Sequence, residues 1–172
     1  MQRLLGVIFI LIGCLGYGYS YMEKERQKIA FAKMWENIML MFYEEIAFKK
    51  QSLAFAAYEI GKKVKEKERE CFIRIYDKMV NQNQKGFATI WLEEWNTYYE
   101  KQSLSTEEKK LIEEFAEITG FNDEKVQIKM LEEQQRKWRK VQLDLMEGQQ
   151  ERKKMVWTLS ACSGAILILI LL

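Results

Sequence analysis

The residue types that most often carry out catalysis are scarce in this chain. Its 172 residues include no histidine and only three cysteines, Cys14, Cys71 and Cys162. Without histidine the chain can form no His-dependent acyl-transfer triad, no His-ligated zinc site and no carboxylate-histidine di-iron site. Cys14 and Cys162 lie in apolar segments, which leaves Cys71 alone in the charged part of the chain. We therefore expect no disulfide framework and no thiolate metal site.

Carboxylates and phosphate-binding loops are the other candidates for chemistry, and neither forms a recognisable pattern. The aspartates Asp77, Asp123 and Asp144 are too scattered to suggest a cation site. The chain contains no Gly-x-Gly-x-x-Gly motif and no phosphate loop. A formal net charge of +2, with basic residues interleaved with glutamates, argues against nucleic-acid binding. We expect a protein that is not an enzyme, with no catalytic residue, no cofactor and no metal.

Two pairs of residues are candidates for binding a partner protein. Glu44 and Glu45 interrupt a strongly apolar stretch and could contact a basic partner. The alternative, which we favour, is that both are exposed and that Glu45 pairs with Lys49 one turn on. Trp91 and Trp95 are also one turn apart and could form a binding platform, because tryptophan is enriched at interface hot spots. In a small bundle such residues more often fill the core, and we favour that interpretation.

The elements that position these residues are predicted to be helices. The chain has no proline and nine glycines, four of which lie in its first apolar segment, so long helices are expected. Apolar residues recur at spacings of three and four, which predicts an all-α fold, an antiparallel bundle of six helices. The first helix is apolar around most of its circumference and should lie in the centre. The expected ranges are 22–50, 53–64, 71–83, 87–101, 105–120 and a last helix from 122 onward, with the charged run 62–70 as a turn.

Several residues are expected to cap these helices. Ser105 and Glu108 have the spacing of a capping box, in which each side chain accepts a hydrogen bond from the backbone of the other residue. Gly120 suits the left-handed position at the end of the same helix. Asn122 is then expected to cap the last helix, and Ser52 the second.

Both ends of the chain are predicted to cross a membrane. Residues 4–21 carry no charge, and residues 155–172 carry no ionisable side chain other than a cysteine. At about 1.5 Å per residue, each run covers roughly the 30 Å hydrocarbon core of a bilayer. Basic residues follow the first run and precede the second, so the positive-inside rule places residues 22–154 in the cytoplasm and both termini outside. The predicted organisation is a span over 1–21, a cytoplasmic bundle over 22–154 and a span over 155–172.

The first apolar segment has other interpretations. A cleaved signal peptide would export the rest of the chain and would move the basic flank of the second span to the wrong side. The run from Leu11 to Cys14 also resembles a bacterial lipobox, in which Cys14 would be acylated. We favour a membrane span, because such four-residue matches are common by chance in apolar segments and the basic start is weak.

Small residues recur in both predicted spans. Gly6 and Gly13 lie two turns apart in the first, and Ser160 and Gly164 lie one turn apart in the second. Small residues let helices approach closely in a bilayer. We expect these four residues to pack against another membrane helix, either in the same chain or in another subunit.

Several stretches resemble the stage III sporulation protein AB family. They are Leu4–Val7 near the start, Glu45–Ile46 in the first long helix, Leu104–Lys109 with Gly120–Lys129, and Leu159–Leu172 at the end. The resemblance covers essentially the whole chain, and 104–129 is its most specific part. The chain departs from the family pattern at 48–53, which has two lysines and no Thr-Pro, and at Ser160, where a glycine is expected.

The resemblance implies a non-enzymatic membrane platform in a channel or secretion-like complex between mother cell and forespore. Family members resemble the second half of the platform proteins of type II secretion and type IV pilus machines, whose cytoplasmic domain is a six-helix bundle. The implied partners are a secretion-type ATPase of the same operon, other channel membrane proteins, the lipid bilayer and further copies of the chain. The implied location is the mother-cell membrane around the forespore. The alternative is a membrane-anchored assembly scaffold without ATPase contact.

Overall fold

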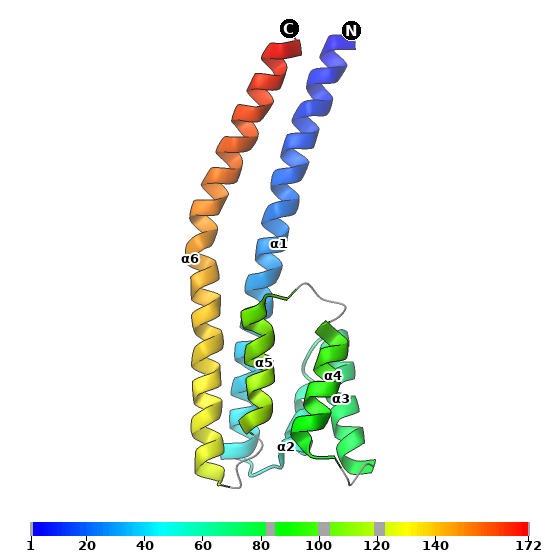
Figure 1. Cartoon of the computed structure of the whole chain (residues 1–172), viewed down its shortest axis with the longest axis vertical. Coiled ribbons are helices and arrows are strands. Elements are labelled where there is room, and N and C mark those ends of the chain that lie inside the picture. Colours follow the sequence, from blue (N-terminus) through cyan, green and yellow to red (C-terminus); the bar gives the residue numbers. More distant parts are fainter. Residues whose placement is uncertain (1, 82–84, 100–103, 119–122, 172) are drawn as a thin grey trace. The chain divides into compact units, whose positions relative to one another are not determined.

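The part of the chain that the structure describes consists of helices and the short connections between them. The computed structural model describes the backbone of residues 2–81, 85–99, 104–118 and 123–171. These residues form six α-helices and no strand, which confirms the all-α prediction (Figure 1). The helices are α1 (Gln2–Ala47), α2 (Leu53–Gly61), α3 (Glu66–Asn81), α4 (Phe87–Tyr99), α5 (Thr106–Ile118) and α6 (Glu124–Leu171).

The helices divide between two compact units. The first, which we call the helix-pair unit, consists of Met1–Phe31 and Lys140–Leu172, and the second, the bundle unit, consists of Ala32–Arg139. The helix-pair unit holds the first part of α1 and the last part of α6. The bundle unit holds the rest of these two helices together with α2, α3, α4 and α5. Each long helix therefore contributes to both units without a break in its backbone.

Within the bundle unit, α1 lies in the centre, as its apolar circumference predicts. The ring of Trp35 contacts the rings of Trp95 on α4, at 4.8 Å between centroids, and Trp138 on α6, at 5.5 Å. About two turns further along α1, the ring of Phe42 contacts those of Phe72 on α3 and Phe115 on α5, at 6.1 Å and 4.8 Å between centroids. These six rings all belong to fully buried side chains. Aromatic contacts from α1 thus reach four other helices of the bundle unit.

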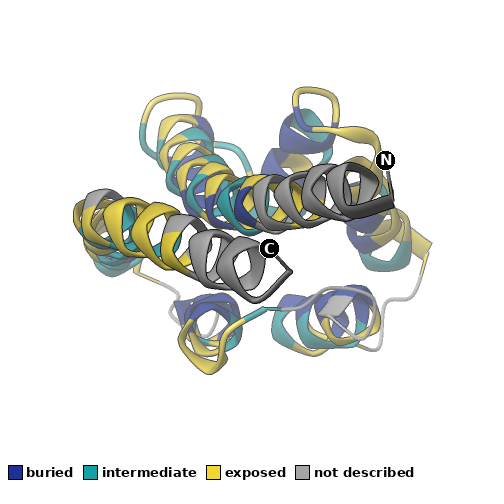
Figure 2. Cartoon of the chain, turned by 90° about the horizontal axis from the view of Figure 1, so that it is seen from above, coloured by how far each residue is buried: buried dark blue, intermediate teal, exposed yellow. Residues whose placement is uncertain are grey.

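The outer helices of the bundle unit are amphipathic. Along these helices, buried residues alternate with exposed ones (Figure 2). On α5 the buried apolar residues are Leu111, Ile112, Phe115, Ala116 and Ile118. Each large apolar side chain that leaves water contributes about 1.5–3 kcal/mol to folding. The buried faces predicted from the apolar spacing therefore supply the main driving force for the bundle.

The third helix begins earlier than predicted. We expected it to start at Cys71, but α3 starts at Glu66, so residues 66–70 are helical and the turn is confined to 62–65. Two acidic residues, Glu66 and Glu68, stand in the first turn of α3. Carboxylates there interact favourably with the helix dipole, and Glu, Lys and Arg are good helix formers. The charged run therefore extends the helix.

The capping residues were mostly predictable. The capping box is confirmed: the backbone N–H of Ser105 donates to Glu108 at 2.8 Å, and the N–H of Glu108 donates to Oγ of Ser105 at 3.2 Å. Ser52 is the N-cap of α2, and its Oγ accepts a hydrogen bond from Phe55 N–H at 3.3 Å. At the start of α6, Asp123 accepts from the N–H of Lys125 at 2.8 Å. The predicted caps Gly120 and Asn122 lie outside the described residues.

The membrane spans expected at the two ends have no support from the structure. Among the described residues, no helix is both long and apolar enough to cross a membrane. Most side chains of the predicted spans, including 1–12 and 163–172, lie outside the described residues. The division of the chain into two spans and a cytoplasmic bundle stays a prediction.

Candidate functional site

The tryptophan pair proposed as a binding platform lies in the core. Trp91 is 0% exposed and Trp95 is 1% exposed. The indole Nε1–H of Trp91 donates to the backbone carbonyl of Ile112 at 2.8 Å, which joins α4 to α5. A ring of Trp91 also lies 4.4 Å from that of Phe115. The favoured interpretation of these tryptophans as core residues agrees with the structure, and neither presents a surface to a partner.

The two glutamates near the end of α1 have different surroundings. Glu44 is exposed, as expected. Glu45 pairs with Lys49 at 2.7 Å, which confirms the predicted ion pair, but it is only 1% exposed. The expected exposure of Glu45 is therefore wrong. A second cation, Lys63, lies 3.4 Å from the same carboxylate oxygen. Because Lys63 follows α2 in the chain, this ion pair links the end of α2 to α1.

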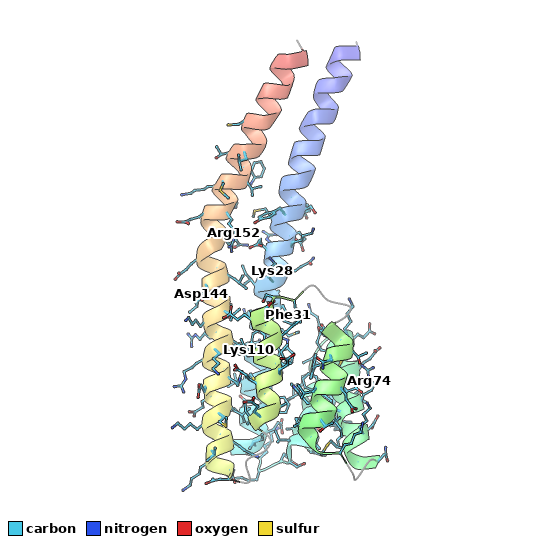
Figure 3. All side chains as sticks on the ribbon, in the orientation of Figure 1. Lys28, Phe31, Arg74, Lys110, Asp144 and Arg152 are labelled. Atoms are coloured by element: carbon cyan, nitrogen blue, oxygen red, sulfur yellow. The ribbon has the colours of Figure 1, made fainter. Side chains whose placement is uncertain are left out.

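Glu94 on α4 is the centre of a buried ion-pair group that sequence analysis missed. Its carboxylate accepts a hydrogen bond from Nε of Arg74 at 2.6 Å and lies 2.6 Å from Nζ of Lys78, both on α3. Figure 3 labels Arg74. Burial opposes the charged form, but the two cations outweigh it and hold the pKa of Glu94 below its ordinary value. No spacing of residues along the sequence predicts this group, because its members lie on α3 and α4, which meet only in the folded bundle.

A second polar link joins the same two helices. The hydroxyl of Tyr98 on α4 donates to Oε1 of Glu68 on α3 at 2.6 Å, and both residues are buried. Burial first, and then the neighbouring carboxylate, raises the pKa of Tyr98 far above its ordinary value. The tyrosine therefore remains a hydrogen-bond donor at neutral pH. Together with Glu94, this contact fixes the position of α3 against α4.

In the helix-pair unit, a buried carboxylate joins α1 to α6. Glu25 on α1 is 7% exposed and lies 3.1 Å from the guanidinium of Arg152 on α6, which Figure 3 labels. Lys28, one turn along α1, also lies 3.1 Å from the Glu25 carboxylate. The same guanidinium lies 3.4 Å from the backbone carbonyl of Leu145. We call this group the Glu25–Arg152 clasp.

Gly148 makes room for the clasp. A Cβ added at this position would lie 2.8–3.0 Å from three guanidinium atoms of Arg152, which real Cβ atoms avoid. The arginine therefore folds back over the bare backbone of α6, one turn from its own position. Glycine costs about 1 kcal/mol relative to alanine inside a helix, so its presence here calls for a packing reason. One feature of the sequence indicates this packing role: a glycine lies within a charged helix and is followed four residues later by an arginine.

The residues predicted to pack in a membrane are only partly described. Gly13 is exposed, and a Cβ added to it would meet no described atom within 4 Å. No described helix therefore packs closely against it. The side-chain surroundings of Gly6, Ser160 and Gly164 lie outside the described residues. Close packing at these four positions stays a prediction.

The described residues offer few groups for catalysis. No cluster of three Cys, Asp or Glu residues among them could hold a metal ion. Cys71 is 1% exposed, and burial raises the pKa of its thiol to about 11. Such a thiol stays protonated at neutral pH and is a poor nucleophile.

Comparison with known proteins assigns the chain to a family. The family model for stage III sporulation protein AB matches residues 3–172. The chain belongs to the stage III sporulation protein AB family. One curated relative, stage III sporulation protein AB of Bacillus subtilis (strain 168), is 23% identical, and the match covers 100% of both chains. The resemblance found from the sequence is thereby confirmed.

A solved structure supports the fold. A structure of stage III sporulation protein AB matches with a TM-score of 0.65 at 17% sequence identity, over 73% of this chain and 98% of that one. At this identity the match establishes the all-helical architecture and carries no residue roles. The family name designates a sporulation component and names no enzymatic activity.

The Glu94 group predicts how stability depends on pH in this family member. Glu94→Gln should lower the free energy of unfolding by about 2 kcal/mol at pH 7, because it leaves two cations without their buried carboxylate. Since the pKa of folded Glu94 is lowered from 4.5, its contribution is complete above that value and is lost as the pH falls below it. The difference between variant and parent should therefore shrink as the pH falls below 4.5. Denaturant titrations followed by tryptophan fluorescence would measure it.

A matched variant separates this effect from general loss of charge. Glu70 pairs with the same Arg74 at 3.5 Å, but its side chain is 72% exposed. Glu70→Gln should change stability by less than about 1 kcal/mol at every pH. An equal loss in both variants, or a loss in Glu94→Gln that does not depend on pH, would contradict the assignment.

The clasp predicts an unusual result at Gly148. Gly148→Ala should displace Arg152 from Glu25 while leaving helix content unchanged, because the better helix propensity of alanine offsets the loss of one ion pair. The Nε atom of Arg152 is buried, so its proton should exchange slowly with water in the parent protein. NMR should show faster exchange in Gly148→Ala and in Glu25→Gln. Gly13→Ala, where the added methyl meets nothing, is the control, and unchanged exchange in Gly148→Ala would refute the clasp.

Proposed function

We propose that this protein is a non-enzymatic platform component of a sporulation channel or secretion-like complex between mother cell and forespore. In this proposal residues 1–21 and 155–172 anchor it in the mother-cell membrane, and the helical bundle lies in the cytoplasm. The bundle receives conformational work from a secretion-type ATPase and passes it to other membrane proteins of the complex. Membership of the stage III sporulation protein AB family supports the sporulation role.

The continuity of α1 and α6 is the observation that carries the transmission role. The first helix runs from Gln2 to Ala47 and the last from Glu124 to Leu171, each as one helix. Hydrogen-bonded helices are stiff over such lengths, whereas a loop would let the two ends move independently. The Glu25–Arg152 clasp supports the proposal further, because its two residues lie a few positions from the segments proposed to enter the membrane, 1–21 and 155–172.

Interrupting α6 without changing its length tests the transmission role. Glu147→Gly combined with Gln149→Gly would give three consecutive glycines with Gly148, and each new glycine costs about 1 kcal/mol of helix stability. Spore formation should fall sharply, while the protein still fractionates with membranes. Glu147→Ala combined with Gln149→Ala removes the same side chains and keeps the helix, so it should sporulate normally. Equal spore formation by the two variants would count against transmission.

The ATPase contact needs its own experiment. Of the two glutamates considered as partner contacts, only Glu44 is exposed, because Glu45 is buried against its lysines. We expect the tagged full chain to co-purify with a secretion-type ATPase from sporulating cells. Glu44→Lys should weaken this capture about two- to tenfold, since rim charges change affinity modestly.

A control charge reversal and an alternative complete the test. Glu66→Lys changes an exposed glutamate at the start of α3 and should leave the capture unchanged. Equal weakening by both variants would remove Glu44 from the contact. Failure of the parent protein to capture any ATPase would favour the alternative, a membrane-anchored assembly scaffold without ATPase contact.

A further inference from the structure

A polar pocket lies between α5 and α6 in the bundle unit. Its volume is about 290 Å³. Of its lining residues, Ile118 and Gln134 are buried, and the charged residues are more exposed. Its lining consists of Lys110, Glu114, Glu117 and Ile118 on α5 and Met130, Glu133, Gln134 and Lys137 on α6.

Gln134 leaves one hydrogen-bond acceptor unused. The residue is 4% exposed, and its Nε2 donates to a carboxylate oxygen of Glu114 at 3.3 Å. This contact fixes the orientation of the amide, because turning it over would set two oxygens against each other. The amide oxygen Oε1 then receives no hydrogen bond from any described residue. A buried acceptor without a donor costs about 1–3 kcal/mol, so a donor from outside would be bound favourably.

The charges around the pocket favour a cation. Lys137 lies 2.9 Å from Glu114, and Lys110 lies 3.9 Å from it. Burial disfavours the charged form of Glu114, but Lys137, Gln134 and Lys110 together outweigh this and hold the pKa of Glu114 below its ordinary value. Two lysines thus face three glutamates, which leaves one negative charge in excess. Glu117 forms no ion pair with any described residue.

We propose that this pocket binds an arginine side chain of a partner protein. A volume of 290 Å³ admits one long side chain and is smaller than most sites for nucleotides or drug-sized ligands. The excess of carboxylates disfavours phosphate, and the charged lining disfavours an apolar group. A guanidinium carries five N–H donors in a plane, so it can serve the Gln134 oxygen and a carboxylate at once, which a lysine ammonium does less well. This inference goes beyond the proposed function, because it requires neither an ATPase nor a membrane.

The test uses the full chain, labelled with ¹⁵N in detergent micelles, and a small arginine probe. The probe is N-acetyl-arginine N′-methylamide, and the control probe is the citrulline analogue, which has the same shape and no charge. We expect saturable NMR shifts at the Gln134 side-chain amide and at backbone amides of α5 and α6, with a Kd on the order of millimolar for the arginine probe. The citrulline probe should bind about tenfold more weakly.

Two variants locate the binding. Glu117→Gln combined with Glu133→Gln should weaken arginine binding about tenfold. Glu113→Gln combined with Glu132→Gln removes the same charge from exposed positions of the same helices outside the pocket, and should bind like the parent. Gln134→Met, which keeps the side-chain length and removes the amide oxygen, should weaken binding without loss of helix content.

Each opposite result would overturn the proposal. Absence of saturable shifts with the arginine probe would show that the pocket does not bind this group. Equal binding of the citrulline probe would remove the role of charge. Equal weakening by the two double variants would place the effect in the general charge of the bundle and not in the pocket.

Discussion

The packing of α1 through Trp35 and Phe42 is the contact on which the bundle unit depends. These two rings are fully buried and reach α3, α4, α5 and α6. Loss of a buried aromatic ring costs about 3–5 kcal/mol, which is a large part of the stability of a domain of this size. The outer helices are short and amphipathic, and helices of that length are not stable alone in water. They are stable as helices because their apolar faces pack against α1.

The helix that organises the core also continues beyond it. Trp35 lies in the bundle unit and Glu25, less than three turns earlier on the same helix, lies in the helix-pair unit. On α6, Trp138 and Arg152 are divided between the units in the same way. Each of these helices has an unbroken hydrogen-bonded backbone between the two residues. This continuity, and not a particular surface residue, is the basis on which we propose the transmission role.

Features that depend on neighbours in sequence were predictable, whereas those that depend on tertiary contacts were not. The capping box at Ser105 and Glu108 follows from a spacing of three residues, and the Glu45 pair with Lys49 from a spacing of four. Burial of Glu45 depends also on Lys63 after the next helix, and no periodicity reports that. The clasp between Glu25 and Arg152 joins the two ends of the chain, so it could be found only once the helices were placed.

The buried polar groups separate the structural contacts of the molecule from its candidate binding site. Among the described residues, the buried carboxylates of Glu25, Glu45, Glu68, Glu94 and Glu108 each have a partner within the chain. Partnered in this way, they fix helix positions. Gln134 is also buried, but its side-chain oxygen Oε1 accepts no hydrogen bond from any described residue. It also lines a pocket with an excess of carboxylates, whereas the five glutamates are parts of closed ion pairs or hydrogen bonds. A buried acceptor without a donor costs free energy, which is why we propose that a donor of another molecule reaches Gln134.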